Sequence, residues 1–157
     1  MRVGIGHDIH RLAPGGPLRL GGVDVPHDRN LVGHSDADVL LHAVIDALLG
    51  AAALGDIGQM FPDTDPANRG RDSAEMLEAA RDAVASVGWR VGNIDCIVHA
   101  QRPRLLPFRQ AIRKRMADIL GIDPERVGLK GKTAEQLGSV GQEKAIVAQC
   151  IALLEPR

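Results

Sequence analysis

The chain has 157 residues, of which 45% are apolar and 25% charged, and its formal net charge is −1. These values are typical of a globular domain and exclude disorder caused by low hydrophobicity and high net charge. The low net charge and the aromatic content of 2% argue against nucleic-acid binding, and no apolar run is long enough to cross a bilayer or to form a secretory signal. We expect one domain over residues 1–157, with neither a nucleic acid nor a membrane as partner.

The two cysteines, Cys96 and Cys150, each lie in an apolar stretch with no second cysteine at a short spacing. This arrangement disfavours a disulfide framework and a cysteine metal site. It predicts buried, reduced thiols and a cytoplasmic location.

The first predicted elements are two strands. Residues 2–9 alternate, with Val3 and Ile5 on one face and Gly4 and Gly6 on the other, which predicts a strand with one face of small residues. A turn over 14–17 precedes a short strand around 18–20.

A helix should follow Ser35 and end near Gly50 or Gly55. Ser35 with Asp38 three residues later forms a capping signal, and Asp36 and Asp38 suit the positive end of a helix dipole. This start would put His34 and Ser35 at a helix N-terminus, where backbone N–H groups favour a phosphate.

The remaining segments alternate between helix and strand. The apolar run over 145–154 fits a buried strand or a buried helix, because periodicity alone cannot separate the two. The alternation of helices and strands along the chain indicates an α/β or α+β fold with helices layered on a sheet. The predicted segments are a loop over 55–71, a helix from 72 or 73 to about 87, a strand over 91–100, a loop over 103–107, a helix over 108–120 and a strand over 126–132.

Three residues form a candidate metal site. Asp8 and His10 lie two apart, so on a strand they share a face, and His42 lies in an otherwise apolar part of the predicted helix. One carboxylate and two imidazoles are common zinc ligands, and three protein ligands leave a fourth position open, as in catalytic zinc sites. A hydrogen-bonded, half-buried histidine is the alternative for His42 taken alone.

Two polar segments are candidate substrate contacts. The glycine-rich loop after Gly55 carries Asp56, Asp63 and Asp65, which could accept hydroxyl protons of a polyol, although a solvated turn has the same composition. Near the C-terminus, Glu135 follows two lysines and a threonine and could hold Mg²⁺ between phosphates. This second segment lacks the glycine-rich lead of a P-loop.

Three motifs together resemble a known family. The sequences Gly-His-Asp-Ile-His from Gly6, Gly-His-Ser-Asp-Ala-Asp-Val-Leu-Leu-His-Ala from Gly33, and Gly-Asp-Ile-Gly from Gly55 with Phe-Pro-Asp-Thr-Asp from Phe61, closely resemble the 2-C-methyl-D-erythritol 2,4-cyclodiphosphate synthases. The resemblance runs over residues 2–154. It implies cyclisation of 4-diphosphocytidyl-2-C-methyl-D-erythritol 2-phosphate to the 2,4-cyclodiphosphate with release of CMP, in the non-mevalonate isoprenoid pathway.

The resemblance also implies a fold and an assembly. We expect an α+β fold with a mixed, mainly four-stranded sheet and helices layered on one face. In a homotrimer the sheets would face a three-fold axis, and the active sites would lie between subunits. The segment 145–154 would then be a strand.

Roles follow from the resemblance for individual residues. Asp8, His10 and His42 match the zinc ligands, and Glu135 matches the ligand of a Mg²⁺ or Mn²⁺ that bridges substrate phosphates. His34 and Thr133 match positions that stabilise the transition state. The positions that match contacts to the methylerythritol phosphate portion are Ser35, Asp56, Ile57, Gly58, Phe61, Pro62, Asp63, Thr64 and Asp65. Those that match the cytidine and phosphate pocket of a neighbouring subunit are Ala100, Gln101, Arg102, Pro103, Arg104, Leu105, Leu106, Lys132 and Ala134.

The chain departs from the family pattern near its C-terminus. Ser139 stands where the family often has Phe, Gln142 replaces a common Arg, and Lys144 replaces an acidic residue. In the family this Arg lies near the trimer axis, where a central cavity can hold a polyprenyl diphosphate or another anion. Lys132 also stands where Thr is common.

Two other functions remain open at this point. A zinc hydrolase would admit water to the open metal position, but no His-Glu-x-x-His motif supplies its base. A non-catalytic trimer that binds anions would show no turnover. Product analysis separates all three functions, because only the synthase yields CMP with a cyclic diphosphate.

Overall fold

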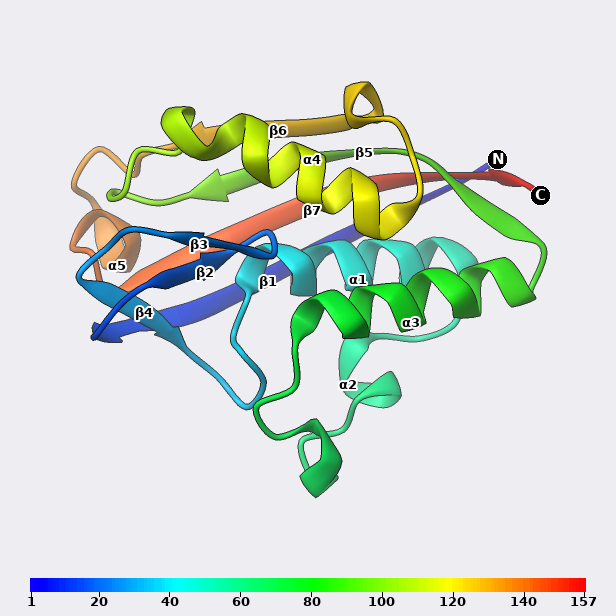
Figure 1. The fold of residues 1–157 in the computed structure, drawn as a ribbon, viewed down its shortest axis with the longest axis horizontal. Helices are drawn as coiled ribbons and strands as arrows, with labels where there is room; N and C mark the ends of the chain where they lie inside the picture. The colour runs from blue at the N-terminus through cyan, green and yellow to red at the C-terminus, as the bar shows by residue number, and fades with distance from the viewer.

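The computed structural model describes residues 1–157, which form a five-stranded mixed sheet with helices on one face (Figure 1). The strand order is β4-β1-β7-β5-β6; only the β5–β6 pairing is parallel. The strands are β1 (Arg2–Pro14), β4 (Arg29–Val32), β5 (Trp89–His99), β6 (Val127–Lys132) and β7 (Ala145–Pro156).

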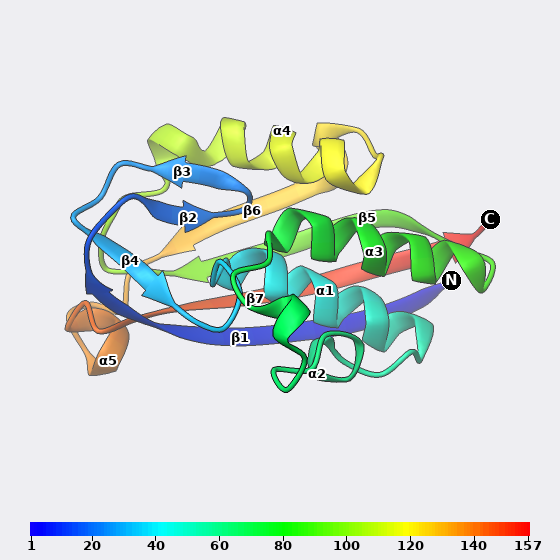
Figure 2. The same cartoon turned by 60° about the horizontal axis from the view of Figure 1, so that its bottom comes forward.

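Three long helices cover the same face of the sheet, and Figure 2 shows the layering from a second direction. Helix α1 packs on β1 and β7, α4 packs on β6, and α3 packs on α1 and β5. Their bounds are α1 (Val39–Ala52), α3 (Ser73–Ser86) and α4 (Arg109–Leu120). The shorter elements are the hairpin of β2 (Leu18–Leu20) and β3 (Val23–Val25), helices α2 (Ile57–Met60) and α5 (Gly138–Gly141), and the 3-10 turns Pro66–Asn68, Leu106–Phe108 and Pro124–Arg126.

The glycine face of β1 lets α1 approach the sheet closely. Gly4 and Gly6 are buried, and a Cβ atom at Gly6 would collide with the carbonyl oxygen of Ala43 in α1. Asp8 and His10 continue the same face of β1. The predicted alternation of β1 is therefore confirmed, and it brings the strand carboxylate and imidazole against the helix.

The opposite face of the sheet is uncovered in the single chain and carries several exposed apolar side chains. Val3 is 67%, Ile5 71%, Ile9 51% and Ile151 51% exposed. Exposed apolar side chains gathered on one face mark an interaction site in many proteins.

Two expectations about the fold were incomplete, and a third was confirmed. The sheet has five strands, because the four-residue strand β4 pairs with the end of β1 and adds an edge. Residues 55–71 contain α2 and a 3-10 turn as well as loop. The run at 145–154 lies within strand β7, as the family resemblance implied.

The helix start was also predicted wrongly. Helix α1 begins at Val39 with Asp38 as its N-cap, whose carboxylate accepts a hydrogen bond from Leu41 N. Ala37 has a φ of 60°, which is incompatible with a helix beginning at Asp36. His34 and Ser35 therefore lie in the loop before α1, and the Asp38 carboxylate itself occupies the helix N-terminus.

None of the helices combines the length and the apolar composition that a membrane span requires.

Candidate active site

Asp8 and His10 from β1 meet His42 from α1 where the strand and the helix face each other. The His10 Nε2 atom lies 2.9 Å from Asp8 Oδ2 and 3.0 Å from His42 Nδ1, and the latter atom lies 3.1 Å from Asp8 Oδ2. The potential donor atoms of these three residues lie close enough to one another to share one metal ion. Tetrahedral zinc bonds of about 2.0–2.1 Å would separate such atoms by about 3.3 Å, so a small outward movement fits zinc.

The hydrogen-bond partner of His10 determines which of its ring nitrogens presents a lone pair to the other two residues of the triad. His10 Nδ1 lies 3.0 Å from the carbonyl oxygen of Val32 in β4. A carbonyl can only accept, so Nδ1 carries the proton of the neutral ring and Nε2 presents a lone pair. This lone pair and the Asp8 carboxylate converge on a shared point, which makes the site suited to a cation.

The charges of the triad reinforce one another. Burial disfavours the charged form of Asp8, but the hydrogen bonds and positive charge of His10 and His42 prevail, and the pKa of Asp8 lies well below its ordinary value. Burial likewise disfavours protonated His10, but its hydrogen bond to Asp8 and the Asp8 charge raise the pKa of His10. A proton and a metal ion therefore compete for the same place.

Helix α1 also anchors the loop that follows it. Asp46, one turn after His42, accepts a hydrogen bond of 2.8 Å from Ile57 N at the start of α2. Burial raises the pKa of Asp46, although this hydrogen bond opposes the shift. The Asp46 contact ties the predicted polyol loop to the metal-ligand helix.

A hollow of about 420 Å³ opens beside the triad. It brings together most of the residues predicted to contact the methylerythritol portion, and it adds Asn68 and Met76, which no motif identified. The lining residues are Asp8, His10, His34, Ser35, His42, Ile57, Gly58, Phe61, Pro62, Asp63, Thr64, Asn68 and Met76.

Two of the predicted loop carboxylates instead cap short helical turns. Asp56 accepts from Gln59 N at the start of α2, and Asp65 accepts from Ala67 N in the turn at Pro66–Asn68. Neither residue lines the hollow. In the single chain these carboxylates thus shape the loop that carries Gly58 and Phe61.

His34 lines the same hollow with an unsatisfied polar atom. Its Nε2 is buried and has no hydrogen-bond partner, whereas its backbone carbonyl accepts from Gly70 N. A buried polar atom without a partner is costly unless a ligand or water satisfies it. His34 Nε2 therefore has an unused hydrogen-bonding capacity in a residue that lines the hollow.

A second hollow, of about 530 Å³, lies beside the ends of β5 and β6. It contains most of the residues predicted for the cytidine and phosphate pocket, together with Thr133. Its lining residues are Val98, Ala100, Gln101, Pro103, Arg104, Leu105, Leu106, Arg109, Leu129, Lys130, Gly131, Lys132 and Thr133.

Three other predicted residues lie outside the linings of both hollows. Glu135 accepts a hydrogen bond of 2.7 Å from Thr133 Oγ1, and Arg102 forms an ion pair of 3.6 Å with Glu143. Ala134 lies between Thr133 and Glu135. Within one chain, Glu135 does not join the triad of Asp8, His10 and His42, and His34 and Thr133 line different hollows.

Comparisons with known proteins identify the family of this chain. The model of the YgbB family matches residues 1–155. A protein of Gemmatimonas aurantiaca named 2-C-methyl-D-erythritol 2,4-cyclodiphosphate synthase is 57% identical over 93% of this chain and 88% of its own length. A protein of the same name from Symbiobacterium thermophilum is 51% identical over the full length of both chains.

Solved structures share the fold. The bifunctional IspDF of Campylobacter jejuni has a TM-score of 0.96 and 39% identity over 99% of this chain, which spans 42% of the bifunctional protein. A 2C-methyl-D-erythritol-2,4-cyclodiphosphate synthase in a CDP-bound form has a TM-score of 0.91 and 38% identity over 98% of this chain and 100% of its own. The chain belongs to the YgbB family.

Proposed function

We propose that this chain is a 2-C-methyl-D-erythritol 2,4-cyclodiphosphate synthase, a phosphorus–oxygen lyase of the non-mevalonate isoprenoid pathway. It converts 4-diphosphocytidyl-2-C-methyl-D-erythritol 2-phosphate to the cyclic diphosphate and CMP. The observation that carries the proposal is the convergence of Asp8, His10 and His42 beside a hollow lined by the family's substrate-contact positions. The proposed domain spans residues 1–157.

The reaction needs no nucleophilic side chain. An oxygen of the 2-phosphate forms a bond to the β-phosphorus, and the bond from that phosphorus to the bridging oxygen breaks, so CMP leaves with this oxygen. The work of the protein is to align the two phosphate arms and to stabilise their negative charge. An intramolecular reaction held in the right geometry can gain on the order of 7–11 kcal/mol from alignment.

Asp8, His10 and His42 would hold a zinc ion with an open fourth position, and Glu135 would hold Mg²⁺ or Mn²⁺. When bound, these cations supply positive charge to the phosphate oxygens. His34 lines the same hollow and would stabilise the transition state, and Ser35, in the same lining, would contact a phosphate. From the second hollow, Thr133 would also stabilise the transition state, and Lys132 would contact a phosphate.

The two hollows support a site shared between subunits. They have no lining residue in common, although one substrate carries both a methylerythritol phosphate and a cytidine diphosphate. The exposed apolar face formed by Val3, Ile5, Ile9 and Ile151 offers a surface for association. We therefore propose that the chain forms a homotrimer, in which the first hollow of one subunit lies beside the second hollow of its neighbour.

The proposed location is the cytoplasm, where the buried thiols Cys96 and Cys150 would stay reduced.

The test is incubation of the purified, metal-loaded protein with the diphosphocytidyl substrate, followed by phosphorus NMR and separation of nucleotides. Equal amounts of CMP and cyclic diphosphate are expected. Linear phosphate products would support a hydrolase, and binding without turnover would support an anion-binding module. Native mass spectrometry measures the number of subunits in the same preparation.

A further inference from the structure

The proposed metal ligand His42 presents its second ring nitrogen to a chain of polar groups. His42 is only 8% exposed, and its Nε2 lies 2.9 Å from the Ser73 hydroxyl and 3.0 Å from the Ser35 hydroxyl. Ser73 is fully buried and begins α3. A serine hydroxyl can donate or accept, so these distances alone do not decide whether Nε2 carries the proton.

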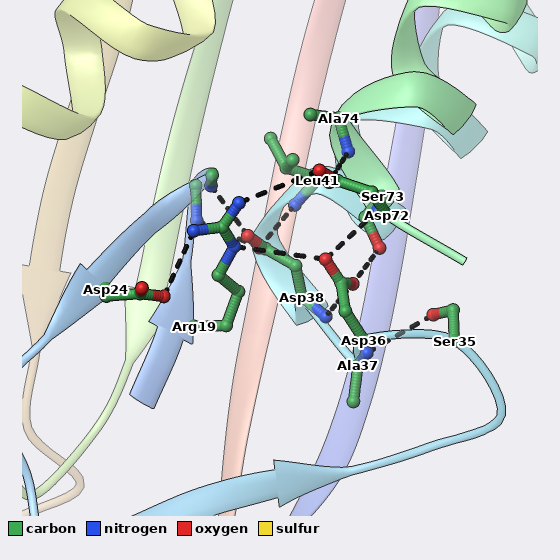
Figure 3. A network of polar contacts seen from close by, with 12 residues as sticks. Arg19, Asp24, Ser35, Asp36, Ala37, Asp38, Leu41, Asp72, Ser73 and Ala74 are labelled. Atoms are coloured by element: carbon green, nitrogen blue, oxygen red, sulfur yellow. Dashed lines mark hydrogen bonds and ion pairs between the residues drawn. The ribbon is translucent and has the colours of Figure 1, made fainter. Parts of the chain in front are cut away.

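Asp36 determines which nitrogen of His42 carries the proton, because a carboxylate can only accept hydrogen bonds. The Ser73 hydroxyl donates to Asp36 Oδ1, and Ser73 N donates to Asp36 Oδ2 over 3.1 Å (Figure 3). With its only proton directed at Asp36, the Ser73 oxygen can serve His42 solely as an acceptor. Nε2 of neutral His42 must then carry the proton, which leaves Nδ1 bare and facing Asp8 and His10.

The position of Asp36 is itself fixed on several sides. Its backbone N donates to Arg71 O, its Oδ1 accepts from Asp38 N over 3.2 Å, and the Arg19 guanidinium lies 3.9 Å from Oδ2. Figure 3 shows Arg19, Asp36 and Ser73 joined in one polar cluster at the start of α3. The carboxylate therefore has little freedom to turn away from Ser73.

We infer that Asp36 and Ser73 are positioning residues that act in series to hold His42 in the Nε2-protonated form required for metal binding through Nδ1. The inference rests on the metal site of the proposed function. It extends the site beyond the three ligands to a loop residue and to the first residue of α3. Partners of this kind orient ligand histidines in metal proteins, and their loss commonly weakens metal binding about 10–100-fold.

A consequence for Ser35 follows from the same reasoning. Its Oγ accepts from Ala37 N over 3.2 Å and lies within reach of the His42 Nε2 proton. Since Nε2 carries that proton, the Ser35 hydroxyl proton points elsewhere. Ser35 lines the first hollow, so this proton is free for a substrate oxygen.

The experiment compares zinc binding by metal-free wild type, Ser73→Ala, Asp36→Asn and the double variant, using competition with a chromogenic chelator. Each single variant should bind zinc about 10–100-fold more weakly. The double variant should bind no more weakly than the weaker single variant, because the two residues act in series. Asp24→Asn is the matched control: Asp24 pairs with Arg19 in the same cluster, is 61% exposed and makes no contact with Ser73, so its zinc affinity should equal that of wild type.

A second readout needs no metal. Nitrogen-15 NMR of the metal-free protein, at about two pH units above the ordinary histidine pKa of ~6.5, reports which nitrogen of His42 is protonated. The Nε2-protonated form should dominate in wild type and decrease in Ser73→Ala and Asp36→Asn. Thermal unfolding of each variant checks that it is folded.

The inference is overturned if wild-type His42 is protonated mainly at Nδ1. It is also overturned if folded single variants keep wild-type zinc affinity, or if their losses add in the double variant. Failure of the proposed function has a different signature: wild type would bind zinc with the expected tautomer but would release no CMP from the substrate.

Discussion

His10 Nε2 lies 3.0 Å from His42 Nδ1, although the two residues are 32 positions apart and belong to a strand and a helix. The rings meet edge to face, with centroids 5.1 Å apart. The contact depends on the close packing of α1 on β1, which Gly4 and Gly6 permit. Metal binding and the packing of the fold are therefore linked, and both can be tested by substitution.

Replacing His42 with Ala should abolish stoichiometric zinc binding, because the substitution removes one of the three ligands. CMP release should fall by more than about 100-fold, because the positive charge of the zinc ion is then missing from the site. Zinc content by atomic absorption and CMP release by chromatography provide the two measurements. His7→Ala is the matched control for zinc content, since His7 is exposed on the opposite face of β1. Full zinc content in His42→Ala would contradict the assignment of the triad.

Zinc affinity should fall as the pH is lowered, and the fall should begin above pH 6.5. The Asp8 carboxylate raises the pKa of His10 above its ordinary 6.5, so protonated His10 persists to higher pH and excludes the ion from Nε2. Chelator competition between about pH 8.5 and 5.5 measures the dependence. An affinity that stays constant over this interval would argue against imidazole ligands.

The metal-free protein should show the corresponding pH dependence of stability. A raised histidine pKa stabilises the fold fully below 6.5, and this contribution is lost as the pH rises through the folded-state value. The lowered pKa of Asp8 has the opposite sign: its contribution is present above 3.8 and is lost on acidification through the folded-state value. Urea unfolding of the metal-free chain should therefore show the combined contribution of this pair at its largest between these two ordinary values.

Gly6→Ala should destabilise the protein by about 1–3 kcal/mol, because the added Cβ would meet the backbone carbonyl of Ala43 and force α1 away from β1. Gly50→Ala is the matched control. Gly50 lies in α1 with open space around its Cβ position, so alanine there should be neutral or stabilising by up to about 1 kcal/mol. Denaturant unfolding compares the two variants. Equal stability of both would show that the close approach of α1 does not depend on the glycine face.

Both cysteines should react slowly with a thiol reagent in the folded protein. Cys96 and Cys150 are direct register partners on β5 and β7, and both are buried. The neighbouring Cys96 thiol and burial raise the pKa of Cys150 well above its ordinary value, which lowers the fraction of reactive thiolate. The rate of absorbance change with an aromatic disulfide reagent should rise sharply on unfolding; rapid labelling of the folded protein would be inconsistent with this packing.

The sequence predicted the elements whose signal is local. The alternation of β1 and the i,i+2 spacing of Asp8 and His10 are properties of one strand. Helix α3 begins at Ser73, one of the two starts that were predicted, and Asp72 is its cap. His42 was already a candidate third ligand from its place in an apolar helix, the family resemblance implied the same role, and its position beside Asp8 and His10 confirms the expected grouping.

The features that sequence missed depend on contacts between distant segments. Ser35 and Asp38 are both competent caps, but the Asp38 carboxylate also accepts from Gly21 N and Gly22 N, and these bonds place it at the helix start. Strand β4 is only four residues long, and it forms because the end of β1 pairs with it. In the sequence Ser73 indicates only the start of a helix, and its contact with His42 forms only in the folded chain.

The separation of the two hollows has a genetic consequence for the proposed trimer. A chain with a defective triad still carries an intact second hollow, and a chain defective at Lys132 still carries an intact triad. Random mixing of two such inactive chains should restore roughly a quarter of the sites, because each site takes one hollow from each of two neighbours. Co-expressed alleles of these two kinds should therefore complement one another, whereas two alleles that damage the same hollow should not.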